Sequence, residues 1–209
     1  YELLAENTID NLLSRVNKFK GSISLLITGD EEGDAVNGTK KVVEYLKKKK
    51  EKIDFCLVGE PTNPNKLGEM IKIGRRGSMT GKLTIIGVQG HVAYPQRANN
   101  PSTALVKILK ELKDIKFDKG TKDFQPTNLE VTKINIHNTA ENVIPGKAEA
   151  VFNIRFNNKH TSQSIKLKLN KIFNKISKKE KSKFSIDYRV SGEAFLTIPN
   201  KTTFMIKDV

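Results

Sequence analysis

The sequence places three acidic residues directly after an apolar run, in "LLITGDEEG" over residues 25–33. Adjacent carboxylates repel one another, and desolvation near the end of a strand adds to the cost of keeping Glu31 and Glu32 ionised. Such a cluster at the end of a core strand is typical of a metal site or a proton-transfer site, where one acid binds the ion and its neighbour acts as a base. Glu60 ends a second apolar run, "FCLVGE", and could add an oxygen ligand. The alternative is an acidic turn that caps a helix.

Two arginines stand between glycines in "GRRGS" over residues 74–78, and Arg155 lies inside the strand-like stretch "FNIRF". Paired guanidinium groups can bind a carboxylate through bidentate hydrogen bonds, although a surface ion pair would also explain Arg75 and Arg76. An arginine in the middle of a strand needs a partner or a ligand anion. These residues are therefore candidates for anion binding.

His91 follows a glycine in "GVQGHVAYP" over residues 87–95, where its ring is exposed enough to donate a hydrogen bond. Asn142 lies in the loop "ENVIPG" and could donate or accept one. His137 and His160 have no comparable surroundings, and we expect them at the surface or at a strand edge. No pair of histidines has metal-binding spacing, so three carboxylates alone would not make a zinc site.

The elements that must position the acids have the order of an α/β sheet. Apolar residues at helical spacing predict helices over residues 3–16 and 37–49. The continuous apolar runs 22–28 and 53–60 predict strands that are covered on both faces of a parallel sheet. Binding sites in such sheets lie outside the carboxyl ends of the strands, where we expect Glu31, Glu32 and Glu60.

The pattern changes after Gly77. Alternating residues predict strands over 78–87, 128–137, 147–156 and 183–190, and helical spacing predicts helices over 101–112 and 161–176. This βαββαβ order is the split ferredoxin-like plan, with an antiparallel sheet on two helices. We therefore expect part of a mixed-sheet catalytic domain at 1–76, an inserted ferredoxin-like domain at 77–190 and a return into the first domain at 191–209.

Composition excludes several kinds of partner. The formal charge is +14, but only six of the 37 basic residues are arginine, and the lysines are spread along helices and loops. We therefore expect no nucleic-acid partner. No apolar run approaches the ~20 residues of a membrane span, so we expect no membrane partner either. The single cysteine, Cys56, excludes an internal disulfide and suits a reducing, cytoplasmic location.

Taken in order, "TGDEEGDA", "VGEP", "GRRGSMTGKLTIIGVQGHVAYPQRANNP", "ENVIPG" and "FNIRF" resemble the succinyl-diaminopimelate desuccinylases. These are dimetal amidohydrolases, related to acetylornithine deacetylase and carboxypeptidase G. The resemblance covers essentially the whole chain. The acidic motifs are shared by the wider superfamily, whereas the long stretch from Gly74 to Pro101 is particular to the desuccinylases. The fold implied is a metallopeptidase-like catalytic domain with an inserted lid and dimerisation domain.

The resemblance implies a role for each candidate residue. Glu31 corresponds to the general acid/base, and Glu32 and Glu60 correspond to carboxylate ligands, one for each of two divalent metals (zinc or cobalt). His91 corresponds to a lid histidine that stabilises the oxyanion in the partner subunit of a homodimer. The residues implied to contact substrate carboxylates are Arg75, Ser78 and Arg155, and Asn142 is a further substrate-binding candidate.

The chain also departs from the family. Glu141 stands where the family often has asparagine, and an acid there would disfavour an anionic substrate. Nothing in the chain matches the remaining metal ligands, a histidine, a bridging aspartate and a late histidine. We therefore expect the central portion of such a protein, inactive by itself. The implied reaction is hydrolysis of N-succinyl-LL-2,6-diaminopimelate to succinate and LL-2,6-diaminopimelate. Other N-acyl amino-acid amidohydrolases, or a non-catalytic dimerisation remnant, are the alternatives.

Overall fold

A computed structural model describes residues 2–15, 20–29, 35–60, 63–66, 69–136, 138 and 140–197. Glu31, Glu32 and His137 lie outside these residues, so their predicted roles stay predictions. The chain divides into two compact units, residues 1–62 and 63–209, and each is described by itself.

The first unit contains the two predicted helices, α1 (Glu2–Arg15) and α2 (Thr39–Lys48). In α2, Val42 and Leu46 lie one helical turn apart and are half-buried, while the lysines that precede and follow them in the helix are exposed. Both predicted helices are therefore confirmed.

The prediction of strands over residues 22–28 and 53–60 is wrong. Both segments lack ladder hydrogen bonds and expose their apolar side chains, with Leu57 84% and Ile27 67% exposed. A β-strand requires backbone hydrogen bonds to an adjacent strand, and no strand among the described residues pairs with either segment. Glu60 is consequently exposed at the end of an extended segment rather than at the edge of a sheet.

The second unit has a four-stranded antiparallel sheet with the order β4-β6-β2-β7. Its strands are β2 (Gly77–Ile86), β4 (Asn128–Asn135), β6 (Lys147–Phe156) and β7 (Lys183–Gly192). With α3 (Pro101–Asp114) and α4 (Ser162–Lys179) they give the predicted βαββαβ order. The split ferredoxin-like prediction is confirmed, with each boundary within three residues of expectation.

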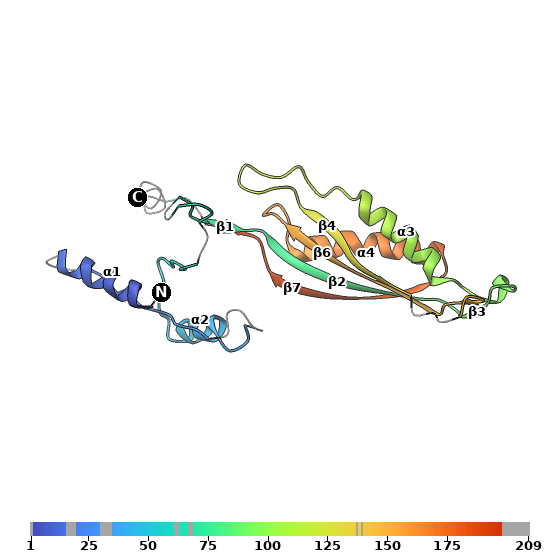
Figure 1. Cartoon of the computed structure of the whole chain (residues 1–209), viewed down its shortest axis with the longest axis horizontal. Helices are drawn as coiled ribbons and strands as arrows, with labels where there is room; N and C mark the ends of the chain where they lie inside the picture. Colours follow the sequence, from blue (N-terminus) through green and yellow to red (C-terminus); the bar gives the residue numbers. More distant parts are fainter. Residues whose placement is uncertain are drawn as a thin grey trace. The chain divides into compact units, whose positions relative to one another are not determined.

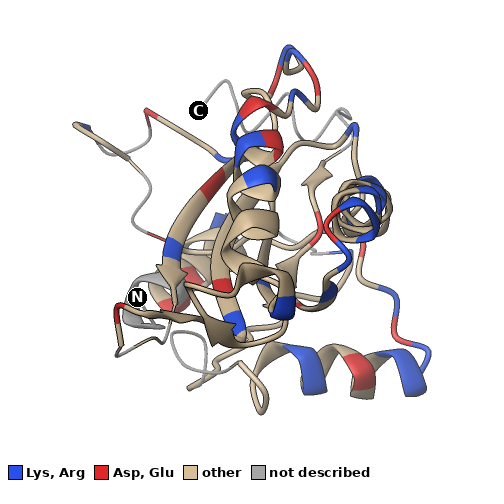
Figure 2. Ribbon diagram, turned by 90° about the vertical axis from the view of Figure 1, so that its right-hand side faces the viewer, with Lys and Arg blue, Asp and Glu red and all other residues tan. Residues whose placement is uncertain are grey.

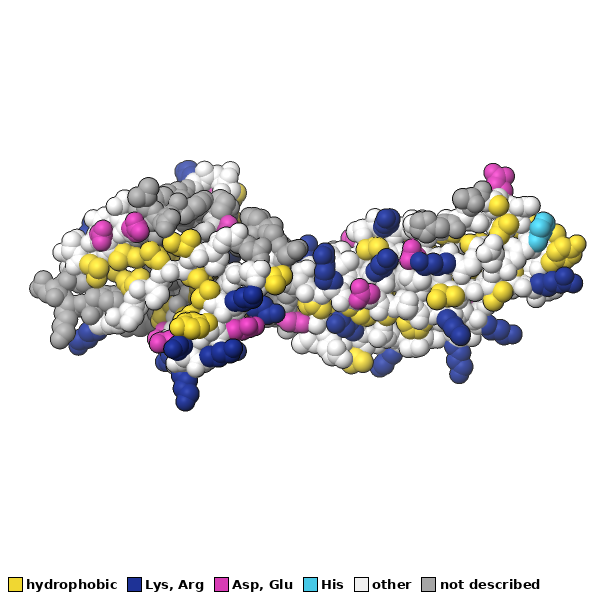
Figure 3. Space-filling model, turned by 90° about the horizontal axis from the view of Figure 1, so that it is seen from below, with side chains coloured by type: hydrophobic (Ala, Val, Ile, Leu, Met, Phe, Trp, Pro, Cys, Tyr) yellow, Lys and Arg dark blue, Asp and Glu magenta, His cyan; other side chains and the backbone are white. Residues whose placement is uncertain are grey.

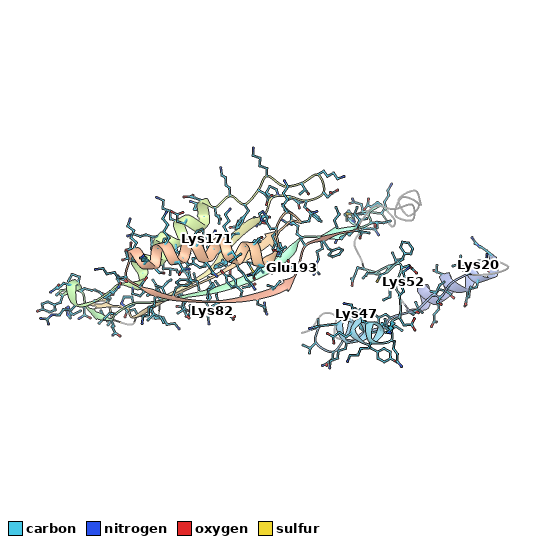
Figure 4. The ribbon with its side chains drawn as sticks, turned by 180° about the vertical axis from the view of Figure 1, so that it is seen from behind. Lys20, Lys47, Lys52, Lys82, Lys171 and Glu193 are labelled. Carbon is cyan, nitrogen blue, oxygen red and sulfur yellow. The ribbon has the colours of Figure 1, made fainter. Side chains whose placement is uncertain are left out.

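Both helices cover one face of the sheet (Figure 1). Alternate residues of β2 and β6 are buried against them, and their neighbours face away. Figure 4 shows the two sides of this unit, with Lys82 on the strands of the sheet and Lys171 on α4. Every buried hydrophobic side chain of the described chain belongs to this unit, including Phe152, Phe156, Phe173, Leu83 and Leu105.

Sequence explains where the helices begin. The Asn100 side chain accepts a hydrogen bond from the Ser102 backbone N–H at 2.9 Å, and Pro101 stands in the first turn of α3. At α4, Thr161 and Ser164 form a reciprocal capping box, each side chain accepting from the other's backbone N–H at 3.1 Å.

Two glycines of β2 lie under phenylalanine rings of β6. Gly77 pairs with Phe156 and Gly81 with Phe152, and a Cβ at either glycine would overlap the facing ring. Both rings are fully buried, and Phe152 also packs on Phe173 with ring centroids 6.3 Å apart. The glycines therefore make room for the aromatic core.

A polar network joins the loop after α3 to the turn before α4. The Asp118 side chain is 7% exposed and accepts hydrogen bonds from Gly120 N–H at 2.6 Å, Thr127 N–H at 3.2 Å and Asn157 Nδ2 at 2.7 Å. His160 Nε2 lies 3.1 Å from its second oxygen. The expectation that His160 lies at the surface or at a strand edge is therefore wrong, because its half-buried ring precedes α4 and meets a carboxylate that is distant in sequence.

Short strands extend the unit at both ends (Figure 1). At one end β1 (Gly74–Arg75) pairs with β8 (Phe195–Leu196), so that the chain enters and leaves the sheet along an antiparallel ribbon. At the other end β3 (Gly90–His91) pairs with β5 (Val143–Ile144), next to the 3-10 helix η1 (Pro95–Arg97). We call the segments around β3 and β5 the tip.

Lys and Arg are distributed over the helices, strands and loops of the chain, and Asp and Glu occur among them (Figure 2). Seen from below, those of the second unit are interspersed with uncharged atoms (Figure 3). The absence of a nucleic-acid partner stays a prediction. None of the helices that the structure describes has the length and apolar character to cross a membrane.

Gly81→Ala should lower the free energy of unfolding by about 2 kcal/mol, because the new methyl group meets a fully buried ring that has no space to move. Urea unfolding followed by circular dichroism measures this change. Gly146→Ala is the matched control, since its Cβ would meet Gln89 Cβ at an ordinary 3.5 Å. Equal unfolding midpoints for the two variants would contradict the expectation.

The Asp118 network should make stability depend on acid pH. Burial raises the pKa of Asp118, but hydrogen bonds from Thr127, Gly120 and Asn157 outweigh it and hold the pKa well below its usual range. The stabilisation is therefore present at pH values above the pKa of Asp118 in the unfolded chain, about 4. It is lost as the pH falls toward the lower pKa of the folded protein. Asp118→Asn should lower the free energy of unfolding by about 1–3 kcal/mol at pH 7.

Thermal unfolding between pH 7 and pH 3 tests this expectation. The difference in thermal midpoint between Asp118→Asn and the unmodified protein should become smaller below about pH 4, where the carboxyl group takes up its proton in the unfolded chain. Asp123→Asn changes an exposed acid of the same loop and is the control. A gap that stays constant across this range would contradict the assignment.

Candidate functional site

Ser78 and Arg155 are brought together by the register of the sheet. They are directly opposite each other on β2 and β6, and Arg155 Nη1 donates a hydrogen bond to Ser78 Oγ. Both side chains point away from the helices, since their neighbours Met79 and Ile154 are buried on the other face. Arg155 thus has a partner on the neighbouring strand, which is one of the two explanations that the sequence left open for it.

Arg75 and Arg76 complete a pocket with these residues. The pocket is lined by Arg75, Arg76, Ser78, Arg155 and Ser191, which we call the basic pocket. Arg76 Nη1 donates to Asn128 Oδ1 at 3.2 Å, and Asn128 is the β4 neighbour of Arg155. Three guanidinium groups, from β1, from β6 and from the residue that joins β1 to β2, therefore line one pocket.

The charge of the basic pocket is positive. No acidic side chain is among its described lining residues. The nearest acid along the chain, Glu193, accepts a hydrogen bond from the Ser162 backbone N–H at 3.0 Å, at the start of α4. This contact holds its carboxylate at a helix N-terminus, which favours negative charge. Guanidinium groups in such a pocket can bind an external anion such as a carboxylate.

His91 lies at the tip with its ring orientation defined by the backbone. The Ala93 N–H donates to His91 Nδ1 at 3.0 Å. Because Nδ1 is an acceptor, the neutral imidazole carries its proton on Nε2, which is then a hydrogen-bond donor. The ring also lies 6.0 Å from that of Tyr94, over which the Arg97 guanidinium stacks at 5.5 Å. The side chain is exposed, so its donor can reach another molecule.

Asn142 is next to His91 across the small sheet of the tip. Its carbonyl oxygen accepts from the Val92 N–H at 3.0 Å, and its neighbour Val143 pairs with His91. The structure therefore joins these two predicted residues from segments that are far apart in sequence. Asn142 and Glu141 are both exposed.

The two groups of predicted residues lie at opposite ends of the sheet. The basic pocket surrounds Ser78 at the start of β2, whereas the tip follows Ile86 at its end. Eight residues of strand separate these positions, which corresponds to about 27 Å. Within this unit, His91 and Arg155 do not reach a single small ligand together.

The described residues do not test the predicted metal ligands as a group, because Glu32 lies outside them. Among them, no three His, Cys, Asp or Glu side chains lie close enough to hold an ion. Glu60 is exposed and is the one predicted carboxylate ligand that the structure describes. The described part of the chain therefore does not itself form a metal site.

Sequence reasoning missed several residues that line the basic pocket or lie next to it. Arg76 was noted only as half of a doublet, and Asn128, Ser191 and Gly192 were not singled out. The last two lie at a register shift between β2 and β7, a feature that no local pattern reveals. The "SG" pair at the end of the predicted strand was the available signal.

Comparison with known proteins agrees with this architecture. The family model of the peptidase dimerisation domain matches residues 73–181. The succinyl-diaminopimelate desuccinylase of Pelagibacter ubique is 78% identical over 201 residues, covering 96% of this chain and 52% of that protein. The enzyme of the same name from Parvibaculum lavamentivorans is 51% identical over 190 residues, covering 91% and 48%. The chain thus spans about half the length of the curated relatives it matches.

Among solved structures, a tripeptidase from Staphylococcus aureus superposes with a TM-score of 0.52 at 17% identity, over 65% of this chain and 34% of that chain. This likeness shows the fold. The matched family segment begins at β1 and runs through α4, so it contains most of the βαββαβ unit, the tip and the β2–β6 side of the basic pocket. The chain therefore belongs to the M20 peptidase dimerisation domain family.

Proposed function

We propose that the protein containing this chain hydrolyses N-succinyl-LL-2,6-diaminopimelate to succinate and LL-2,6-diaminopimelate. The observation that carries the proposal is the basic pocket, in which Arg155, hydrogen-bonded to Ser78, lies beside Arg75 and Arg76. The substrate has several carboxylates, and guanidinium groups without an acidic neighbour favour such a ligand. Relatives named for this activity are similar over nearly the whole chain.

In this proposal the two ends of the sheet act on different parts of the reaction. Arg75, Ser78 and Arg155 bind and orient substrate carboxylates. His91 donates its Nε2 proton in a hydrogen bond to the amide oxygen as it becomes an oxyanion, and Asn142 binds substrate nearby. Glu31 takes a proton from the attacking water and passes it to the leaving amine when the carbon–nitrogen bond breaks.

The 27 Å estimated between the tip and the basic pocket supports a homodimer. A small substrate held by the basic pocket of one copy needs the His91 of a second copy. The domain division 1–76, 77–190 and 191–209 stays part of this proposal, with 77–190 as lid and dimerisation domain. A cytoplasmic location belongs to it as well, as expected for amino-acid biosynthesis.

Glu32 and Glu60 remain the proposed carboxylate ligands of two divalent metals, zinc or cobalt. Metals bound there would supply a Lewis acid beside the water and the amide. The described residues do not form this site, so Glu32 and Glu60 need further ligands to bind metal tightly.

Metal stoichiometry and substrate hydrolysis test the function. We expect two metals and turnover of the succinyl substrate in a polypeptide extended at both ends to the length of its relatives, and neither in the chain alone. Turnover of N-acetylornithine instead would favour another N-acyl amino-acid amidohydrolase. No turnover in either polypeptide would favour a dimerisation module without chemistry.

Arg155→Ala in the extended protein should raise KM for the succinyl substrate at least tenfold, because one charge-assisted contact to a carboxylate is lost. Turnover of an N-acetyl analogue, which lacks the terminal carboxylate, should fall less. Steady-state kinetics on both substrates measure this difference. Lys122→Ala, which removes an exposed cation of the 115–127 loop, is the control. Equal losses on the two substrates would contradict the assigned role.

Mixed dimers test whether His91 acts across the interface. His91→Ala and Glu31→Ala chains should each be nearly inactive alone. Co-refolded in equal amounts, they should regain about one quarter of the unmodified activity, because half of the dimers then carry one intact site of two. No recovery, with dimer formation verified by light scattering, would place His91 in its own chain's site.

A further inference from the structure

We infer that Gly192 is a positioning residue of the basic pocket: its missing side chain leaves the space that the Arg75 guanidinium occupies. This inference rests on the proposed function, because it concerns how that pocket binds a substrate carboxylate. It adds Gly192 to a pocket lined by Ser191 of the same strand, by residues of the β1–β2 segment and by Arg155 of β6.

The register of the sheet puts Gly192 next to the pocket. Gly192 is opposite Ser78 on β7, while Arg155 is opposite Ser78 on β6. The three residues therefore form a row across neighbouring strands, with Ser78 in the middle. Arg155 and Gly192 are separated by two strand spacings, about 10 Å, which leaves room for a carboxylate between guanidinium groups above the row.

The space above Gly192 is filled by Arg75. A Cβ at residue 192 would overlap Arg75 Nη2 and lie 3.5 Å from its Cζ, and no other heavy atom outside the adjacent residues lies within 4 Å. The guanidinium thus lies across the end of β7, where any side chain would displace it. Because only the mobile end of Arg75 is affected, a methyl group here leaves the core and the backbone unchanged.

The register shift explains why the chain makes this space. The β2–β7 ladder shifts between Ser78 and Met79, so that Ser191 is an extra residue on β7. Such a bulge bends the strand and redirects the side chains around it. Ser191 itself lines the basic pocket, and Glu193, on the other side of Gly192, bonds to the start of α4 (Figure 4). Gly192 therefore lies between Ser191, which lines the cationic pocket, and Glu193, whose carboxylate bonds to the start of α4.

Gly192→Ala should move the Arg75 guanidinium and weaken carboxylate binding without unfolding the protein. In the extended protein we expect KM for the succinyl substrate to rise about tenfold, the loss of one charge-assisted contact, with kcat within about twofold. The thermal midpoint should stay unchanged. Gly146→Ala, whose Cβ meets only the Gln89 side chain and backbone at 3.5 Å or more, is the matched control.

A double-mutant cycle identifies the route of the effect. If Gly192 acts through Arg75, Gly192→Ala should raise KM no further in an Arg75→Ala background, because the displaced group is already absent. Equal effects of Gly192→Ala in both backgrounds would overturn the inference. A lowered thermal midpoint for Gly192→Ala would overturn it too, since the change would then act on the fold.

Succinate binding separates this inference from the proposed reaction. Calorimetric titration of the extended protein with succinate should show weaker binding for Gly192→Ala than for Gly146→Ala. That result supports the role of Gly192 even if no hydrolysis occurs and the proposed function fails. Unchanged succinate affinity, or an unmodified protein that binds no succinate, overturns the inference whatever the activity.

Discussion

The side-chain alternation of β2 is the constraint on which the second unit depends. This strand lies between β6 and β7, so its register fixes both neighbours. Met79, Leu83 and Ile85 are fully buried toward the helices, which forces Ser78 to the opposite face. Shifting the register by one residue would exchange the two faces and expose the core. Burial of the core thereby holds Ser78 beside Arg155.

The same strand shows how packing and binding share a short segment. In "GRRGS", the second glycine admits the Phe156 ring to the core, while the arginines and the serine line the basic pocket. The Asp118 network lies close by, because Asn157 follows β6 directly and is fully buried. Its hydrogen bonds fix the loop after α3 against the end of the strand that carries Arg155. The exposed arginine therefore stands on a rigid support.

The two ends of the sheet have different physical characters. One end gathers cations around a pocket, whereas the tip presents a single oriented imidazole beside exposed apolar residues such as Val92 and Tyr94. A rigid sheet keeps these ends apart. A domain of this design suits a protein in which separate copies contribute separate parts of one site, as proposed above for the homodimer.

Local patterns were sufficient for much of this fold. Helical spacing located α1, α2, α3 and α4, and alternation located the four strands of the sheet, since each signal repeats within a few residues. The residue types and spacing also singled out His91, Arg155 and the "GRRGS" segment. Local patterns gave wrong strand predictions at residues 22–28 and 53–60, because these apolar runs have no partner strand among the described residues.

Contacts between distant segments decided the rest. Three contacts of the second unit join segments that are 40 or more residues apart in the chain. They are the contacts of His91 with Asn142, of His160 with Asp118 and of Arg75 with Gly192. Strand order, register and the shift at Ser191 create these contacts. The sequence by itself determined the four helices, the four strands of the main sheet, the family and the chemical types of the site residues. Only the tertiary structure decided which of them meet, because a ladder aligns residues by their partners on other strands and not by their neighbours in the chain.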